Sequence, residues 1–165
     1  MTPISVPGNS NSQQGGFTLL EILVVLLVIG IISAAVALGV SMDDRRTTAI
    51  EASRLADLLE EAEEEAMSRG EKLAWSGAGD SYLFWKMDEA GKWQQIADDD
   101  LFKGHVFQDG ISIDAVNLNG LPSDKKIVFN PSGVNTPFRI VLSGTESKIG
   151  ISGDAMNRVT VESNE

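Results

Sequence analysis

The sequence predicts an α+β protein, in which a long N-terminal α-helix packs on a small antiparallel β domain. A membrane-length apolar run occupies residues 17–40, and an amphipathic helical pattern fills residues 41–70. Short apolar runs separated by turn residues then continue from residue 71 to residue 165. Because the helical period ends before the alternating runs begin, helix and strands are segregated along the chain, as they are in α+β folds.

Residues 1–16, MTPISVPGNSNSQQGG, form the first segment and carry no charged side chain. They are rich in Gly, Ser, Asn, Gln and Pro, a composition that cannot bury enough apolar surface to offset the entropy of ordering the chain. We therefore predict a short disordered leader that ends at Gly16.

Residues 17–40 form the second segment, in which Glu21 is the only charged residue. About 20 apolar residues in a helix cross the ~30 Å hydrocarbon core of a bilayer, so this run is long enough to span one. It is also longer than the apolar region of a simple signal peptide, which has about 7–15 residues. We predict a transmembrane half of the N-terminal helix, with Gly30 and Gly39 as the candidate positions for a bend.

Residues 41–70 continue the helix with an amphipathic pattern. No Gly or Pro interrupts the chain from Ser41 to Arg69, and Gly70 provides a C-terminal stop. Apolar residues at helical spacing predict one buried stripe, made of Ile50, Leu55, Leu58, Leu59, Ala62, Ala66 and Met67. Because Glu and Asp fill the opposite face, we interpret the acidic run at residues 60–65 as a solvated face.

The β domain is predicted for residues 71–165 from apolar or alternating runs that turn residues separate. These runs are residues 72–75, 82–87, 93–97, 111–116, 126–129, 138–142, 148–151 and 158–161. Residues 127–153 read as three antiparallel strands, with a turn at residues 130–133. Trp75, Trp85 and Trp93 lie in strand-like runs, where aromatic side chains normally build the core, so we favour core positions over a stacking platform.

The composition disfavours several classes of function. With 24 acidic and 13 basic residues the formal net charge is −11, so nucleic acid is not an expected partner, because duplex binding depends on Lys and Arg. The chain has no Cys and therefore no thiol nucleophile. His105, the only histidine, has no nucleophile or second metal ligand at a recognisable spacing, and we interpret it as a solvated or satisfied loop residue. We expect no enzyme activity, no catalytic residue and no cofactor.

The acidic cluster Asp98, Asp99 and Asp100 is a second candidate for metal binding, because calcium favours oxygen ligands. The cluster lacks the alternating D-x-D-x-D-G pattern of a calcium loop. A solvated turn is therefore favoured, and no metal site is predicted.

Glu21 requires an explanation, because a lone carboxylate near the bilayer centre costs about 2.5–3.5 kcal/mol on insertion scales. Near the start of the run it could also lie at the interface or be protonated. If the chain were cut between Gly16 and Phe17, the new α-amine would have a pKa near ~8 and lie one helical turn from Glu21. Pairing of these charges, within one chain or between neighbouring chains, would set the axial register of packed subunits.

The motif G-F-T-L-L-E at residues 16–21, followed by a long aliphatic run, resembles the class III signal of type IV pilins and type II secretion pseudopilins. The resemblance implies that a prepilin peptidase cuts after Gly16 and methylates the new N-terminus, Phe17. It also implies that Glu21 is the glutamate of the motif, which pairs with the Phe17 amine of its own or a neighbouring subunit.

The C-terminal part of the chain is similar to the β domain of the GspH/FimT family of minor pseudopilins and minor pilins. The stretches that carry this resemblance are residues 129–133, 138–142 and 149–153, whereas residues 75–125 match no pattern of the family. Membership would imply a structural minor pseudopilin of a type II secretion system, which assembles at or near the pseudopilus tip and helps to export folded proteins across the outer membrane.

The resemblance also implies partners and a location. The expected partners are the prepilin peptidase/N-methyltransferase, other minor pseudopilins, the major pseudopilin and the inner-membrane assembly platform. The expected location is the bacterial inner membrane, with a single span, a cytoplasmic N-terminus and a periplasmic C-terminal domain that joins the pseudopilus on assembly. The leader lacks the Lys or Arg that usually holds such an end in the cytoplasm, so this orientation follows from the motif and not from charge.

Three alternatives stay open at the level of sequence. A minor pilin of a type IV pilus would share the helix and the β domain, and a membrane-anchored periplasmic binding module would have no fibre role. The A-x-A triplet Ala35-Val36-Ala37 could also be cut by a conventional signal peptidase, although Glu21 and the length of the apolar run disfavour such cleavage.

Overall fold

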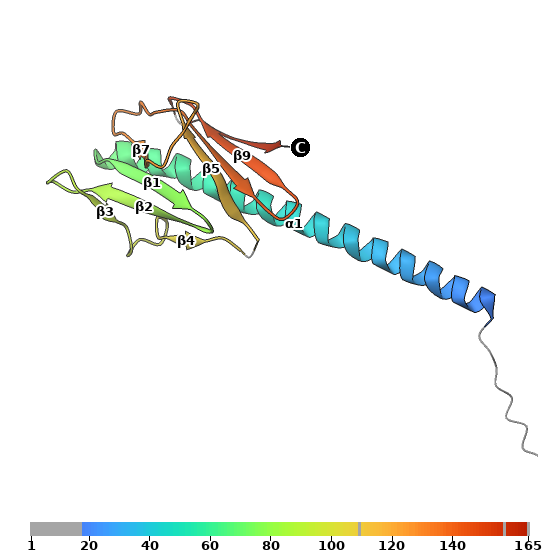
Figure 1. Cartoon of the computed structure of the whole chain (residues 1–165). Helices are drawn as coiled ribbons and strands as arrows, with labels where there is room; N and C mark the ends of the chain where they lie inside the picture. Colours follow the sequence, from blue (N-terminus) through green and yellow to red (C-terminus); the bar gives the residue numbers. More distant parts are fainter. Residues whose placement is uncertain (1–17, 109, 157, 165) are drawn as a thin grey trace, which may run out of the picture. The chain divides into compact units, whose positions relative to one another are not determined.

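The structure, a computed structural model, describes residues 18–108, 110–156 and 158–164, with side chains for all of these except residues 35–43 and 164. The fold class is α+β, as predicted, because one long helix, α1 (Leu19–Arg69), precedes the strands (Figure 1). The chain divides into two compact units, residues 1–39 and residues 40–165. The second unit contains the C-terminal part of α1 and the strands.

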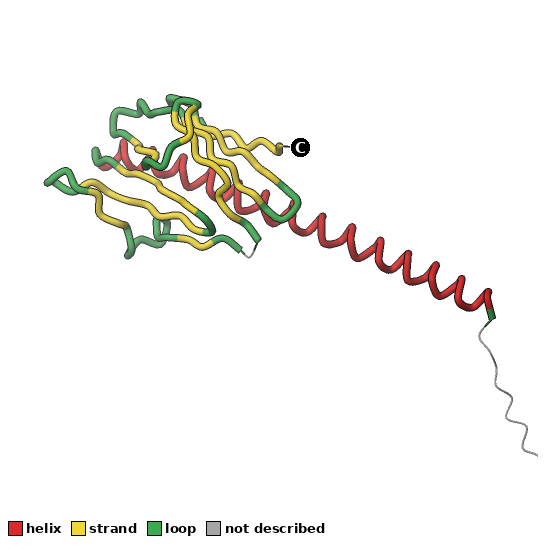
Figure 2. The backbone as a smooth tube through the Cα atoms, viewed as in Figure 1, coloured by secondary structure: helices red, strands yellow, loops and turns green. Residues whose placement is uncertain are grey.

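Ten strands follow α1 within the described residues, joined by short loops (Figure 2). They are β1 (Leu73–Ala78), β2 (Ser81–Met87), β3 (Trp93–Gln95), β4 (His105–Val106), β5 (Ser112–Leu118), β6 (Leu121–Pro122), β7 (Ile127–Phe129), β8 (Phe138–Ser143), β9 (Lys148–Gly153) and β10 (Val159–Asn164).

The strands form two antiparallel sheets. The first has the order β3-β2-β1-β7, with β4 also paired to β2, and the second has the order β10-β9-β8-β5-β6. Buried side chains from both sheets and from the C-terminal part of α1 form one hydrophobic core. The core therefore lies between the amphipathic part of the helix and the inner faces of the two sheets.

Helix α1 ends where the sequence predicts. Gly70 has a φ of 68°, in the left-handed region that glycine adopts without steric cost. The backbone N–H of Glu71 donates to the carbonyl oxygen of Ala66 at 3.2 Å, which is the longer of the two bonds that close a helix with a C′ glycine. The assigned helix continues through Gly30 and Gly39, the predicted candidates for a bend.

The centre of the predicted helical stripe is confirmed, because Leu55, Leu59, Ala62 and Ala66 are fully buried and Leu58 is buried. Each buried Leu contributes about 1.5–3 kcal/mol relative to an exposed one. These side chains dock the helix on the sheets.

The prediction of burial is wrong at the two ends of the stripe, since Ile50 is 58% exposed and Met67 is 46% exposed. A step of five residues turns a helix by about 140°, so Ile50 faces away from Leu55. Ala52 and Ala56 are buried instead, because small side chains let the helix approach the sheets closely.

The three antiparallel strands predicted in residues 127–153 are confirmed as β7, β8 and β9. β8 and β9 pair with each other, but β7 pairs with β1 in the other sheet. The predicted turn is confirmed, because the N–H of Gly133 donates to the carbonyl oxygen of Asn130 at 3.0 Å. This turn begins the connection that carries the chain from one sheet to the other.

Two short strands were not predicted, and the bounds of others differ. β4 and β6 have two residues each, too few to give an alternating pattern. β1 continues to Ala78 through residues that read as turn material, because it forms a hairpin with β2 in which Ala78 pairs with Ser81.

Candidate functional site

The predicted processing site lies at the start of the chain. Gly16 and Phe17 lie outside the described residues, and Glu21 lies in the first turn of α1. The N–H of Glu21 donates to the hydroxyl oxygen of Thr18 at 3.2 Å, so Thr18 caps the helix. The helix dipole favours a carboxylate in this first turn.

This cap by Thr18 is a feature that the sequence-based reasoning missed. Thr18 and Glu21 have the S/T-x-x-E spacing of a capping box, and T-L-L-E was the signal that could have revealed it. Thr18 therefore has a structural role at the helix start, where it accepts from the backbone N–H of Glu21.

Residues 18–34 have an apolar surface on every side of the helix. All of their side chains are exposed, including Leu19 (89%), Leu23 (65%) and Leu26 (64%). A helix that is apolar all round is stable when lipid or other apolar helices cover it.

Among the described residues, no helix is long and apolar enough for a membrane crossing. The predicted span of residues 17–40 includes Phe17 and the side chains of residues 35–40, which lie outside the described part of the chain. The side chains of the alternative cleavage triplet Ala35-Val36-Ala37 also lie outside the described part.

Glu63 joins α1 to the loop that follows β7. It is only 7% exposed, and its Oε1 accepts from the Nδ2 of Asn135 at 2.7 Å. The Oδ1 of Asn135 accepts from the N–H of Asn130 at 2.7 Å. The interpretation of residues 60–65 as a wholly solvated face is therefore wrong at Glu63, because this carboxylate satisfies a buried amide.

Glu51 is a second buried carboxylate on α1, with 4% of its surface exposed. Its Oε2 lies 3.1 Å from the Nε2 of His105, and the imidazole packs against the rings of Tyr82 and Phe107. Burial raises the pKa of Tyr82 to about 12. His105 is thus a satisfied histidine, as interpreted from the sequence, although it lies in strand β4 and not in a loop.

Asp44 connects the helix to the β8–β9 hairpin. Its carboxylate accepts from the backbone N–H groups of Thr145 and Glu146, each at 3.0 Å, and from the hydroxyl of Ser147 at 3.1 Å. The hydroxyl of Thr48, which is fully buried, donates to the carbonyl oxygen of Asp44 at 2.9 Å. The N–H of Glu146 holds the pKa of Asp44 below its ordinary value, with smaller contributions from Thr145 and Ser147.

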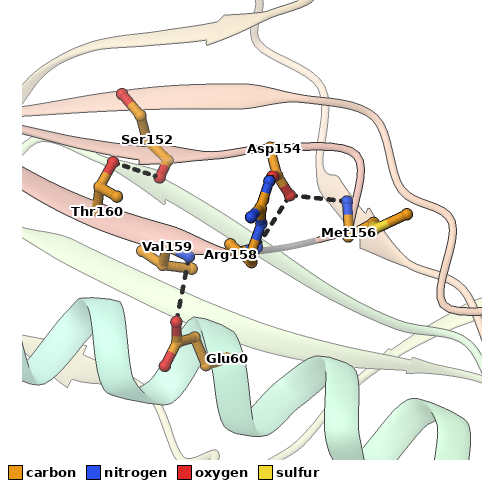
Figure 3. A network of polar contacts seen from close by, with 7 residues as sticks. All are labelled: Glu60, Ser152, Asp154, Met156, Arg158, Val159 and Thr160. Carbon is orange, nitrogen blue, oxygen red and sulfur yellow. Dashed lines mark hydrogen bonds and ion pairs between the residues drawn. The ribbon is translucent and has the colours of Figure 1, made fainter.

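Glu60 joins the helix to the start of β10, as Asp44 joins it to the β8–β9 hairpin (Figure 3). Its Oε1 accepts from the N–H of Val159 at 3.1 Å. The turn before Val159 is fixed by Asp154, whose carboxylate accepts from the N–H groups of Met156 (2.8 Å) and Arg158 (3.0 Å). The Arg158 contacts hold the pKa of Asp154 below its ordinary value.

The acidic cluster at residues 98–100 forms a turn, as predicted. The carboxylate of Asp99 accepts from the N–H of Leu101 at 2.8 Å and from that of Phe102 at 3.0 Å. The N–H of Phe102 makes the larger contribution to lowering the pKa of Asp99. Within the described ranges, no group of three or more His, Asp or Glu side chains is arranged to hold a metal ion.

The three tryptophans do not share one environment. Trp75 is buried in the core, as predicted. The core prediction is wrong for Trp85 and Trp93, which are half-buried. The indole N–H of Trp85 donates to the hydroxyl of Ser76 at 2.8 Å, and the Nζ of Lys126 lies 4.0 Å from the centre of its ring.

Comparison with protein families gives two matches. The model of the family described as type II transport protein GspH matches residues 51–164, which include the stretch 75–125 that carried no recognisable pattern. The prokaryotic N-terminal methylation motif matches residues 11–37. Among curated proteins, no relative matches the chain significantly.

Two solved structures of the minor pseudopilin EpsH, from the type 2 secretion system of Vibrio cholerae, are similar in fold. One is 17% identical, with a TM-score of 0.59 over 70% of this chain and 96% of that chain. The other is 14% identical, with a TM-score of 0.61 over 72% of this chain and 97% of that chain.

Proposed function

We propose that the chain acts by assembly and not by catalysis. It belongs to the type II transport protein GspH family and is a minor pseudopilin of a type II secretion system. It joins other minor pseudopilins at or near the tip of the pseudopilus. There it helps folded proteins to cross the outer membrane.

The observation that carries this proposal is the apolar surface of residues 18–34. These side chains are exposed all round the helix, so the described part of the chain does not cover them, and Glu21 is the only charged residue among residues 18–34. We propose that inner-membrane lipid covers this surface before assembly and that helices of neighbouring subunits cover it afterwards. Since both surroundings are apolar, the transfer between them loses little hydrophobic free energy.

The N-terminal methylation match supports a processing step before assembly. In this proposal the prepilin peptidase/N-methyltransferase cuts after Gly16 on the cytoplasmic side and methylates Phe17. The β domain then lies in the periplasm, and the inner-membrane assembly platform moves the subunit into the fibre.

Glu21 has a defined part in this step. The new amine of Phe17 is cationic at neutral pH and one helical turn from Glu21, so the two charges neutralise each other in an apolar medium. An unpaired charge between packed helices is expensive, so pairing across subunits fixes their axial register.

The test separates the charge of Glu21 from the helix cap that Thr18 provides. Glu21→Gln removes the charge but keeps the backbone N–H that donates to Thr18. We expect Glu21→Gln to be inserted and cleaved normally, and to enter the fibre roughly tenfold less, because an uncompensated amine remains. Incorporation is measured from the amount of chain that in-cell cross-linking joins to other pseudopilins.

Thr18→Val is the matched control, because it removes the capping hydroxyl and leaves the carboxylate. Its cost is about 1 kcal/mol of local helix stability, and we expect nearly normal incorporation. Normal incorporation of Glu21→Gln would contradict the pairing of Glu21 with the Phe17 amine. A mature chain that mass spectrometry shows to begin still at Met1 would contradict cleavage after Gly16.

A further inference from the structure

A groove lies between α1 and the loop that joins β3 to β4. Its helix side is one face of residues 46–58, because the lining positions recur at steps of three or four residues, and Asp100 and Leu101 form the facing wall. From Arg46 to Asp57 an α-helix rises about 17 Å, which is about three turns. The groove is therefore long enough for about three turns of a second helix that lies along it.

The groove presents apolar side chains to the outside. Ile50 is 58% exposed and Leu101 is 45% exposed, so the described part of the chain leaves both of them uncovered. Ala49 and Ser53, which are also exposed, lie one turn apart on the helix side. Because these two side chains are small, a second helix can approach this face closely and bury Ile50 and Leu101.

The loop wall of the groove is held in place by the core. Phe102, next to Leu101, is buried, and its ring centre lies 5.1 Å from that of Phe84 in β2. The carboxylate of Asp99 accepts from the backbone N–H groups of Leu101 and Phe102. The wall is thus formed before any partner arrives, so a partner that binds here loses little free energy to ordering of the loop.

The charges of the groove balance, although the whole chain has a formal net charge of −11. Arg46 and Arg54 are matched by Asp57 and Asp100, and all four side chains are exposed. A strongly basic or strongly acidic segment would therefore gain little net attraction from this lining. An uncharged apolar helix loses nothing by the balance, because the four charged groups can stay hydrated at the rim while the apolar side chains are covered.

Residues 18–34 show the kind of helix that fits this description. They are apolar on every side, and Glu21 is the only charged residue among them. In the proposed fibre, the corresponding stretch of each neighbouring subunit also has to be covered by apolar surface. The groove provides such a surface on α1 itself, in the part of the helix that follows the predicted span.

We propose that this groove is the docking site for the apolar N-terminal half-helix of a neighbouring pseudopilin. Ile50 and Leu101 contact its apolar side chains, and Ala49 and Ser53 allow the close approach of the two helices. This inference rests on the proposed function, because it assigns the surface of the β domain unit that covers a neighbour's helix within the fibre.

The first experiment identifies the occupant directly. A photoreactive benzophenone amino acid replaces Leu101 in the full-length chain, and cells that contain the other pseudopilins are irradiated. We expect cross-linked products with another pseudopilin, in which mass spectrometry places the partner's modified residue in its N-terminal apolar stretch. Val106 is the matched control position, because it is an exposed apolar residue (65%) of the same segment that does not line the groove. It should give roughly tenfold less of this product.

Three results would overturn the inference. They are a modified residue in the partner's β domain, a product that joins only two copies of this chain, and a product with phospholipid alone. The same probe in place of Leu23 separates this inference from the proposed function, since Leu23 lies in the apolar stretch itself. Products with pseudopilins from position 23 but not from position 101 would overturn the groove and leave the proposed function standing. Absence of such products from both positions would overturn both.

A second experiment changes the chemistry of the groove. Leu101→Asp places a carboxylate where the neighbour's apolar helix would bury it, so we expect roughly tenfold less chain to be cross-linked to other pseudopilins in cells. Val106→Asp introduces the same charge outside the groove and should leave this amount at the parent level. Because both side chains are exposed, the thermal midpoint of each variant should stay within a few degrees of the parent value. Equal losses in the two variants, or no loss in Leu101→Asp, would contradict the proposal.

Discussion

Residues 18–34 and residues 44–69 belong to one helix, but their side chains have opposite surroundings. In the first stretch every side chain is exposed, and almost all are apolar. In the second stretch one stripe is buried in the core, while the opposite face is exposed and largely charged. The helical backbone is common to both, so packing decides which stretch the chain stabilises by itself and which stretch requires partners.

The largest expected effect comes from a matched pair of leucines. Leu59 is fully buried and Leu23 is 65% exposed, so Leu59→Ala should lower the free energy of unfolding by about 2–5 kcal/mol and Leu23→Ala by no more than about 0.5 kcal/mol. Chemical denaturation of the detergent-solubilised full chain measures both. Equal losses of unfolding free energy in the two variants would contradict the different burial of Leu59 and Leu23.

A second pair sharpens the comparison within the acidic run. Glu63→Ala leaves the buried amide of Asn135 without its 2.7 Å acceptor, and we expect a loss of about 2 kcal/mol. Glu64→Ala, at an exposed neighbouring position, should cost no more than about 0.5 kcal/mol. The midpoints of urea unfolding distinguish them, and similar midpoints would contradict the structural role of Glu63.

The smallest expected effect is the pH dependence of the Asp44 contact. The pKa of Asp44 is lowered from 3.8 in the folded protein. The contact of Asp44 with the hairpin therefore stabilises the fold above about pH 3.8. This stabilisation is lost as the pH falls through the lower pKa that Asp44 has in the folded state. Asp44→Asn should cost about 1 kcal/mol at pH 7, because it removes a charged acceptor of two backbone N–H groups.

The difference between parent and Asp44→Asn should shrink as the solution is acidified below pH 3.8. Subtracting the two unfolding curves removes the contributions of Asp99 and Asp154, whose pKa values are also lowered. A difference that stays constant down to the most acidic pH would indicate that the carboxylate charge of Asp44 does not act on the hairpin.

Local patterns predicted those features that depend on neighbours in sequence. The stop at Gly70, the core positions Leu55 and Leu59, and the turn that begins at Asn130 are all confirmed. Each depends on backbone conformation or on helical periodicity, which a few adjacent residues set.

Features that depend on distant residues were not predictable in the same way. Glu51 and Glu63 read as solvated acids, because their partners His105 and Asn135 lie more than 50 residues away in sequence. The pairing of β7 with β1, and not with β8, likewise depends on which sheet offers a partner edge.

The sequence by itself determined the α+β class, the long helix and the motif around Glu21, because composition, period and spacing are local properties. Only the tertiary structure decided which carboxylates of α1 are buried and that β10 is the outermost strand of its sheet. The physical reason is that burial and strand pairing are set by contacts between segments far apart in the chain, which no local pattern records.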